Sequence, residues 1–368
     1  MRAAGSTSSF RLIALPSIAW AIVTATPFAA WGQTPDPGTP AVAAAVETHP
    51  SLKLHGFSDV EYVASERASA PKGFHLGQFV IHFSSALDKN VSFFGEVSGT
   101  PGRDAFAFEV ERSFVRYDYN DALKISFGRY HTPIGYWNTA FHHGLWLQTT
   151  IRRPEQIRIG GTFVPVHFVG LKAEGALPSG GLGLGYELGV GNGRSEVLSR
   201  GGDAGDPNTN RAWLVELSAR PIVPYGLRVG GGLYRDRLST STRPSIDEWI
   251  WSGFAAWTRE TPELLAEFIA VHHRDGQAGA AYDSRAFYLQ AACRLPGRAH
   301  PVKLYSRYEE MDVAAAEPVF GFPDLQVLTA GLRFDVTALA ACKVEYRNEF
   351  LAGPGRADAL LFQTSFTF

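Results

Sequence analysis

One segment of the sequence concentrates positive charge. Between residues 131 and 162, three arginines stand against a single acid: Arg152, Arg153 and Arg158 against Glu155. Its charge is therefore +2 when the histidines are neutral. Fixed guanidinium groups favour anions, most strongly in a narrow aqueous space with a dielectric below that of bulk water. These arginines could instead be structural and pair with Glu109, Glu111 or other acids, and the sequence leaves both interpretations open.

Two pairs of adjacent histidines are the candidates for a metal site, His142-His143 and His272-His273. Neighbouring residues of a strand point to opposite faces, and the sequence has neither an HExxH motif nor a nearby cysteine pair. We therefore interpret these histidines as polar loop residues. The sequence predicts no metal ligand and no cofactor.

Catalytic signatures are weak. An acyl hydrolase needs a serine and a histidine oriented by an acid or amide. Ser113 with His142 is one candidate pair, but no G-x-S-x-G motif accompanies it. We therefore predict that the protein is not an enzyme and predict no catalytic residues.

The composition excludes several classes of protein. The chain has 368 residues, of which 45% are hydrophobic, 12% aromatic and 19% charged. Its mean hydropathy of −0.07 is too low for a bundle of transmembrane helices, and its aromatic content is too high for a disordered chain. A net charge of −2 offers no basic excess for nucleic acid.

The N-terminus is typical of a secretory signal peptide. Basic residues precede an apolar run broken by prolines, and Ala30-Trp31-Gly32 supplies a small-x-small cleavage site before Gln33. Residues 1–32 are therefore predicted to be a signal peptide, with an uncleaved anchor as the alternative. Residues 33–51, rich in alanine and proline, are predicted to be a disordered linker.

The rest of the chain, residues 52–368, alternates apolar and polar residues with the period of a β-strand. The sequence predicts sixteen strands and an all-β fold. Their expected bounds are 52–64, 74–87, 91–98, 105–119, 123–130, 163–176, 182–191, 211–220, 227–237, 248–258, 263–272, 283–294, 301–310, 325–336, 341–351 and 359–368. Connections after even-numbered strands are short and those after odd-numbered strands mostly longer, as in outer-membrane barrels. The connection 131–162 is the longest and is the third at the long-loop end.

Alternation alone does not say which face points inward, because a sandwich buries its apolar face and a membrane barrel exposes it. Full charges in the middle of one strand, at Lys343, Glu345 and Arg347, favour a wet lumen. The final strand ends with Phe366 and Phe368 on one face, which resembles the assembly signal of bacterial outer-membrane proteins. Together with the signal peptide, these features predict a transmembrane antiparallel β-barrel.

The start of the long connection carries a more specific resemblance. Phe127-Gly128-Arg129 ends a predicted strand, and Pro133-Ile134-Gly135 leads into the loop. This pattern resembles bacterial outer-membrane porins, in particular the superfamily around the phosphate-selective porins O and P. The specific motif covers residues 123–160. The loop has no lysine, so dedicated phosphate specificity is not expected.

The resemblance implies a water-filled channel in the outer membrane for passive diffusion of small hydrophilic solutes. It also implies that the third loop narrows the pore, so that Arg152, Arg153, Arg158 and Glu155 would form the constriction and favour anions. Such porins are commonly homotrimers surrounded by outer-membrane lipid. Two alternatives remain: a barrel with acyl hydrolase activity, and a sugar-selective channel. Three tryptophans on one strand face could line a sugar path, but an aromatic girdle at the membrane interface is the favoured interpretation of Trp249, Trp251 and Trp257.

Overall fold

The computed structural model describes residues 50–368 apart from 103–104, 195–196 and 241–242. The predicted signal peptide, residues 1–32, lies outside the described residues, and so does the predicted linker as far as residue 49. Among the described residues, no helix is long and apolar enough to cross a bilayer.

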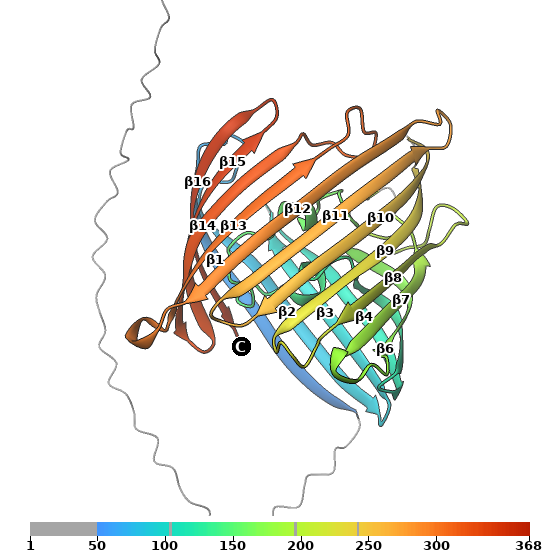
Figure 1. The fold of residues 1–368 in the computed structure, drawn as a ribbon, viewed down its shortest axis with the longest axis horizontal. Helices are drawn as coiled ribbons and strands as arrows, with labels where there is room; N and C mark the ends of the chain where they lie inside the picture. Colours follow the sequence, from blue (N-terminus) through green and yellow to red (C-terminus); the bar gives the residue numbers. More distant parts are fainter. Residues whose placement is uncertain (1–49, 103–104, 195–196, 241–242) are drawn as a thin grey trace, which may run out of the picture. The chain divides into compact units, whose positions relative to one another are not determined.

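Within the described chain, sixteen strands form one closed antiparallel barrel (Figure 1). Each strand pairs with its neighbours in sequence, and β1 pairs with β16 to complete the ring. The strands are β1 (Ser51–Ser65), β2 (Gly73–Asp88), β3 (Val91–Pro101), β4 (Phe106–Asn120), β5 (Leu123–His131), β6 (His167–Ala176), β7 (Leu184–Asn192), β8 (Ala212–Ala219), β9 (Leu227–Thr240), β10 (Arg243–Thr258), β11 (Glu263–Asp275), β12 (Ala281–Arg294), β13 (Val302–Asp312), β14 (Leu325–Thr337), β15 (Ala340–Leu351) and β16 (Gly355–Thr367). The predicted fold class is confirmed.

The largest differences between predicted and observed bounds are at the starts of β6, β10 and β16. Strand β6 begins at His167 rather than at residue 163, so the third connection runs from 132 to 166. Pro165 explains this shift, because proline has no N–H to donate to a strand ladder. Strands β10 and β16 begin earlier than predicted, where Arg243 and Arg356 interrupt the apolar alternation.

The chain closes the barrel with its last residue. The backbone N–H of Gly56 donates to the Phe368 carbonyl at 2.8 Å, and the Phe368 N–H donates back at 3.0 Å. A Cβ atom on Gly56 would lie 2.2 Å from the Phe368 ring, so this position has no room for a side chain. As predicted, Phe362, Phe366 and Phe368 share the outer face, while Gln363 is buried on the inner face.

The connection lengths follow the predicted alternation in part. The three longest connections, residues 132–166, 193–211 and 313–324, all follow odd-numbered strands. Other connections at the same end are short, such as 102–105 and 352–354. The long-loop end is therefore dominated by three loops.

The two faces of the wall differ as a membrane barrel requires. Outside, Phe74 and Phe127 are 83% and 71% exposed. Inside, Lys343, Glu345 and Arg347 are buried on successive inward positions of β15. Hydrocarbon cannot hydrogen-bond a charge, so this orientation places the apolar face toward lipid and the charges toward the interior.

Part of the inner wall is apolar, which corrects the prediction that polar faces line the whole lumen. Ile250, Ile269 and Tyr288 point inward and pack against Trp137 and Phe163 of the third connection. The cluster is a hydrophobic core inside the barrel. It fastens the third loop to one side of the wall.

Candidate functional site in the barrel lumen

The third loop, residues 132–166, contains one helical turn, α1 (Trp137–Ala140), and a 3-10 turn, η1 (Glu155–Ile157). Its first half is anchored on the apolar wall. The backbone N–H of Trp137 donates to Glu267 on β11 at 2.6 Å, and Tyr288 donates to the same carboxylate at 2.7 Å. The Arg307 guanidinium lies 5.5 Å from the Trp137 ring centroid. A buried aromatic and a shared carboxylate therefore hold this part of the loop.

The middle of the loop is held by charged side chains of β14 and β15. The Lys343 ammonium donates to the carbonyls of Leu145 and Thr150 at 2.5 and 3.1 Å. Glu345 accepts the backbone N–H of Ile151 at 2.7 Å, and Arg333 donates to the Gln148 carbonyl at 3.0 Å. These contacts join residues almost 200 positions apart. The loop therefore crosses the inside of the barrel, as the resemblance to porins implied.

Two of the candidate arginines face open space in the lumen. The Arg152 guanidinium binds both oxygens of Glu61 on β1, at 3.2 and 2.9 Å, yet the side chain is 35% exposed. Arg158 is 57% exposed and lies 3.3 Å from Glu155. Glu155 also accepts a 2.6 Å contact from Arg347 on β15. Both arginines have an acidic partner and remain accessible.

The third candidate, Arg153, is placed differently. All three of its guanidinium nitrogens are buried, and none has a hydrogen-bond partner among the described residues. Burial lowers the pKa of Arg153 to about 10, so the group stays charged at neutral pH. Its charge interacts with Glu111 on β4 rather than with the open space of the lumen. The sequence could not distinguish the environment of Arg153 from that of Arg152, because the two residues are of the same type and adjacent.

The acids named from the sequence as alternative partners pair mainly with other residues, although Glu111 also interacts with Arg153. Glu109 pairs with Arg129 and Arg200. Glu111 lies beside His143 and His167. The accessible arginines pair instead with Glu61 and Glu155, as described above. Barrel closure brings β1 against the loop, and no local pattern in the sequence indicates that approach.

A cavity of about 540 Å³ lies between the loop and the wall formed by β1, β2, β15 and β16. Its charged lining comprises five arginines and four acids: Arg67, Arg152, Arg153, Arg158 and Arg347, with Asp59, Glu61, Glu155 and Glu349. The acids are at most 24% exposed, less than Arg152 or Arg158. The accessible charge of this cavity is therefore mainly positive.

The structure does not place the candidate residues of either alternative function where that function needs them. Ser113 is exposed on the outer face of β4, whereas His142 is buried inside and bonded to Asn138 at 2.8 Å, so they form no catalytic pair. The inward residues of β10 include Ile250 and Phe254, which places the tryptophans of this strand on the outer face. They do not line a sugar path in the lumen.

A cluster of four histidines at the base of the third loop is not indicated by the sequence, which predicts His142 and His143 only as polar loop residues. His131 ends β5 and His167 begins β6, and the two face each other in the strand register. His142 and His143 of the loop join them, so that one ring nitrogen from each histidine lies within 4.8 Å of the others. The pairing of β5 with β6 would have predicted the contact between His131 and His167. The approach of His142 and His143 depends on the path of the loop, which only the folded structure shows.

A closed sixteen-stranded barrel with an apolar outer wall, a charged interior and a loop across its lumen is the architecture of porins of the bacterial outer membrane. Known structures share this fold. An anion-selective porin from Comamonas acidovorans aligns over 87% of this chain and 100% of its own, with 13% identity and a TM-score of 0.64. OmpF of Salmonella typhi, solved with daunomycin, aligns over 86% and 97%, with 12% identity and a TM-score of 0.62. The outer-membrane channel DcaP of Acinetobacter baumannii aligns over 87% and 97%, with 9% identity and a TM-score of 0.58.

No protein-family model matches the sequence. No curated protein matches it either. The similarity is therefore one of fold.

Proposed function

We propose that this protein is a porin that lets small hydrophilic solutes diffuse passively across the outer membrane, with a preference for anions. In this proposal Arg152 and Arg158 set the preference, and Glu155 moderates it. Arg153 acts structurally, because all three of its guanidinium nitrogens are buried even though the residue borders the cavity. The protein carries out no covalent chemistry and needs no cofactor for transport.

The observation that carries the proposal is the imbalance of accessible charge. Arg158 and Arg152 expose 57% and 35% of their side chains to the lumen cavity, whereas Glu61 exposes 3%. An ion in a narrow passage interacts mainly with the charges it can approach, since buried ion pairs present almost no net field. One protein of similar fold is described as an anion-selective porin, which supports the proposal.

Reversal potentials measure this preference directly. The purified protein is reconstituted in a planar bilayer with a gradient of KCl across it. We expect single-channel steps and a reversal potential of the sign produced by chloride. A reversal potential of the opposite sign rules out the anion preference, and an absence of conductance rules out the channel.

The proposal extends to targeting and assembly. Residues 1–32 would be removed as a signal peptide, residues 33–51 would form a linker, and the mature chain would assemble as a homotrimer in outer-membrane lipid. Structures of similar fold include a trimer form of OmpT from Vibrio cholerae. Intact mass measurement of protein taken from outer membranes tests the cleavage before Gln33.

A further inference from the structure

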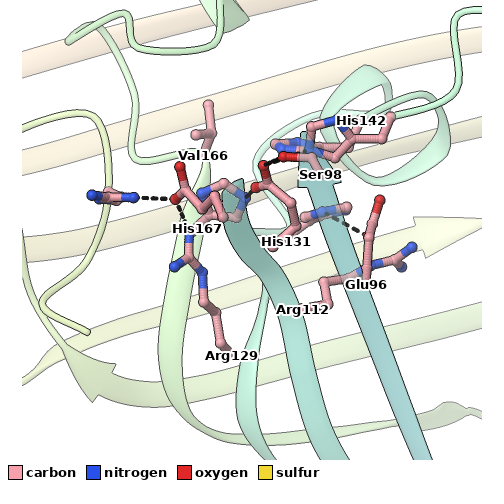
Figure 2. Close-up of polar contacts among 12 residues, drawn as sticks. Glu96, Ser98, Arg112, Arg129, His131, His142, Val166 and His167 are labelled. Atoms are coloured by element: carbon pink, nitrogen blue, oxygen red, sulfur yellow. Dashed lines mark hydrogen bonds and ion pairs between the residues drawn. The ribbon is translucent and has the colours of Figure 1, made fainter. Parts of the chain in front are cut away.

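The four histidines at the base of the third loop form a buried cluster from three separate segments. His131 and His167 come from the ends of β5 and β6, and His142 and His143 come from the loop. Their exposed fractions are only 4–6%. Figure 2 shows His131, His142 and His167 grouped beside Glu96. Burying four imidazole rings together destabilises the folded state unless their nitrogens form hydrogen bonds or bind a ligand.

The Nε2 atoms of all four rings are buried. Those of His131 and His142 have no hydrogen-bond partner among the described residues, and those of His143 and His167 lie beside the Glu111 carboxylate. The Nδ1 atoms of His142 and His143 lie 2.8 Å from the Asn138 amide oxygen and 3.1 Å from that of Gln78. An amide oxygen accepts a hydrogen bond, so it fixes a proton on Nδ1. The Nε2 atom of His142 then has a free lone pair, and that of His143 gains one when a metal ion displaces the proton it shares with Glu111. Histidines that bind metals have this arrangement.

The surrounding charges also suit a cation. Glu111 places its carboxylate oxygens 3.2 Å from the Nε2 of His143 and 2.8 Å from the Nε2 of His167. Glu96 lies 3.6 Å from the Nε2 of His131. Arg112 neutralises Glu96 at 2.5 Å, and the Arg153 guanidinium, which makes no hydrogen bond but interacts with Glu111, opposes a cation. Glu111 is the acid closest to the ring nitrogens and would balance the charge of a bound ion.

We propose that His131, His142, His143 and His167 bind one divalent transition-metal ion of the zinc type, with Glu111 as the balancing carboxylate. Zinc, copper and nickel ions bind imidazole nitrogen well, whereas magnesium and calcium ions prefer oxygen ligands. Four protein ligands in a buried position leave no open coordination site, which is the pattern of a structural metal. The ion joins the third loop to the wall at β5 and β6.

The geometry needs a small adjustment to close around the ion. A tetrahedral zinc ion with bonds of about 2.0–2.1 Å holds its nitrogens roughly 3.4 Å apart. The four ligand atoms now lie within 4.8 Å of one another, and the rings of His131 and His142 stack with centroids 3.6 Å apart. In the proposed complex these two rings rotate about their side-chain torsions so that their nitrogens point to a common centre.

Metal binding can be measured without any transport assay. The full chain, without an affinity tag, is purified folded in detergent, stripped with a chelator and dialysed. Zn²⁺ is then added and counted by mass spectrometry. We expect one tightly held Zn²⁺ per chain, and X-ray absorption of the loaded protein should show an all-nitrogen and oxygen shell with imidazole scattering. A folded protein that retains no Zn²⁺, or a shell of water oxygens alone, overturns the proposal.

Variants assign the site. His142→Ala and His143→Ala should each lower the affinity for Zn²⁺ by at least about 100-fold, and Gln78→Leu by about 10-fold, since it removes an orienting contact. His272→Ala is the matched control, because His272 lies on β11 and pairs with Asp283 outside the cluster. Heat-modifiable migration in detergent gels confirms that each variant is a folded barrel. Equal Zn²⁺ affinity in folded His142→Ala and His272→Ala overturns the assignment.

Discussion

At the scale of single residues, exposure distinguishes side chains that the sequence treats alike. Arg152, Arg153 and Arg158 have the same charge and lie within one segment. All three border one cavity, but only Arg152 and Arg158 are accessible, and the guanidinium group of Arg153 is buried without a hydrogen-bond partner among the described residues. Ion selectivity depends on the accessible charge, so the three should contribute unequally.

The first prediction concerns these arginines. The double variant Arg152→Ala/Arg158→Ala should lower the ratio of chloride to potassium permeability several-fold, because it removes the accessible positive charge and leaves Glu61 and Glu155 each with one basic partner fewer. Arg153→Gln should change the ratio little. Reversal potentials in a KCl gradient measure both. A larger effect from Arg153→Gln than from the double variant would contradict the placement described here.

At the scale of elements, the third loop is held by charged side chains rather than by local sequence. Lys343, Glu345 and Arg333 bind the backbone of residues 145–152 from the opposite wall. Hydrogen bonds to charged groups contribute about 1.5–3 kcal/mol each. A loop anchored in this way keeps a fixed position inside the barrel.

The second prediction tests that anchor. Lys343→Met removes two contacts, to the carbonyls of Leu145 and Thr150, and should release the middle of the loop while the barrel stays closed. We expect noisier single-channel current and faster tryptic cleavage after Arg152. Lys89→Ala, in an exposed turn between β2 and β3, is the control. Unchanged noise and cleavage in Lys343→Met would show that the apolar core alone holds the loop.

The third prediction concerns the closing strand. Deleting Phe368 removes the two backbone hydrogen bonds to Gly56, each contributing about 1 kcal/mol, and the ring that covers this glycine. The deletion should reduce the yield of folded barrel in outer membranes, measured by heat-modifiable migration. Deleting the ring alone with Phe368→Ala should have a smaller effect. Equal yields for the deletion and the parent would show that closure depends on the remaining register of β1 and β16.

At the scale of the whole molecule, the outer wall offers apolar area for lipid and for other copies of the chain. Small residues on an outer wall can allow close contact between barrels. Gly56 and Gly95 do not provide such a contact, because the ring of Phe368 covers Gly56 and the ring of Phe83 covers Gly95. Neither glycine leaves an open surface for a second barrel.

The fourth prediction concerns assembly. The protein purified from outer membranes in mild detergent should have the mass of three chains, measured by light scattering with the detergent subtracted. Since the covered glycines provide no contact, Gly95→Ala should affect the fold of the monomer, where its Cβ would lie 2.0 Å from Phe83, before it affects assembly. A monomeric mass for the folded parent protein would rule out the trimer.

The sequence by itself determined the class of fold, because each strand must alternate its faces between hydrocarbon and the interior, and that constraint is local and repeats every two residues. It therefore located sixteen strands, the long third connection and the closing Phe368. Only the tertiary structure decided which side chains meet inside. Contacts such as Glu61 with Arg152 or Glu345 with Ile151 join segments about 90 and 190 residues apart, and the histidine cluster depends on the path of a loop with no periodic pattern. Such contacts follow from barrel closure and loop packing, and no local property of the sequence encodes them.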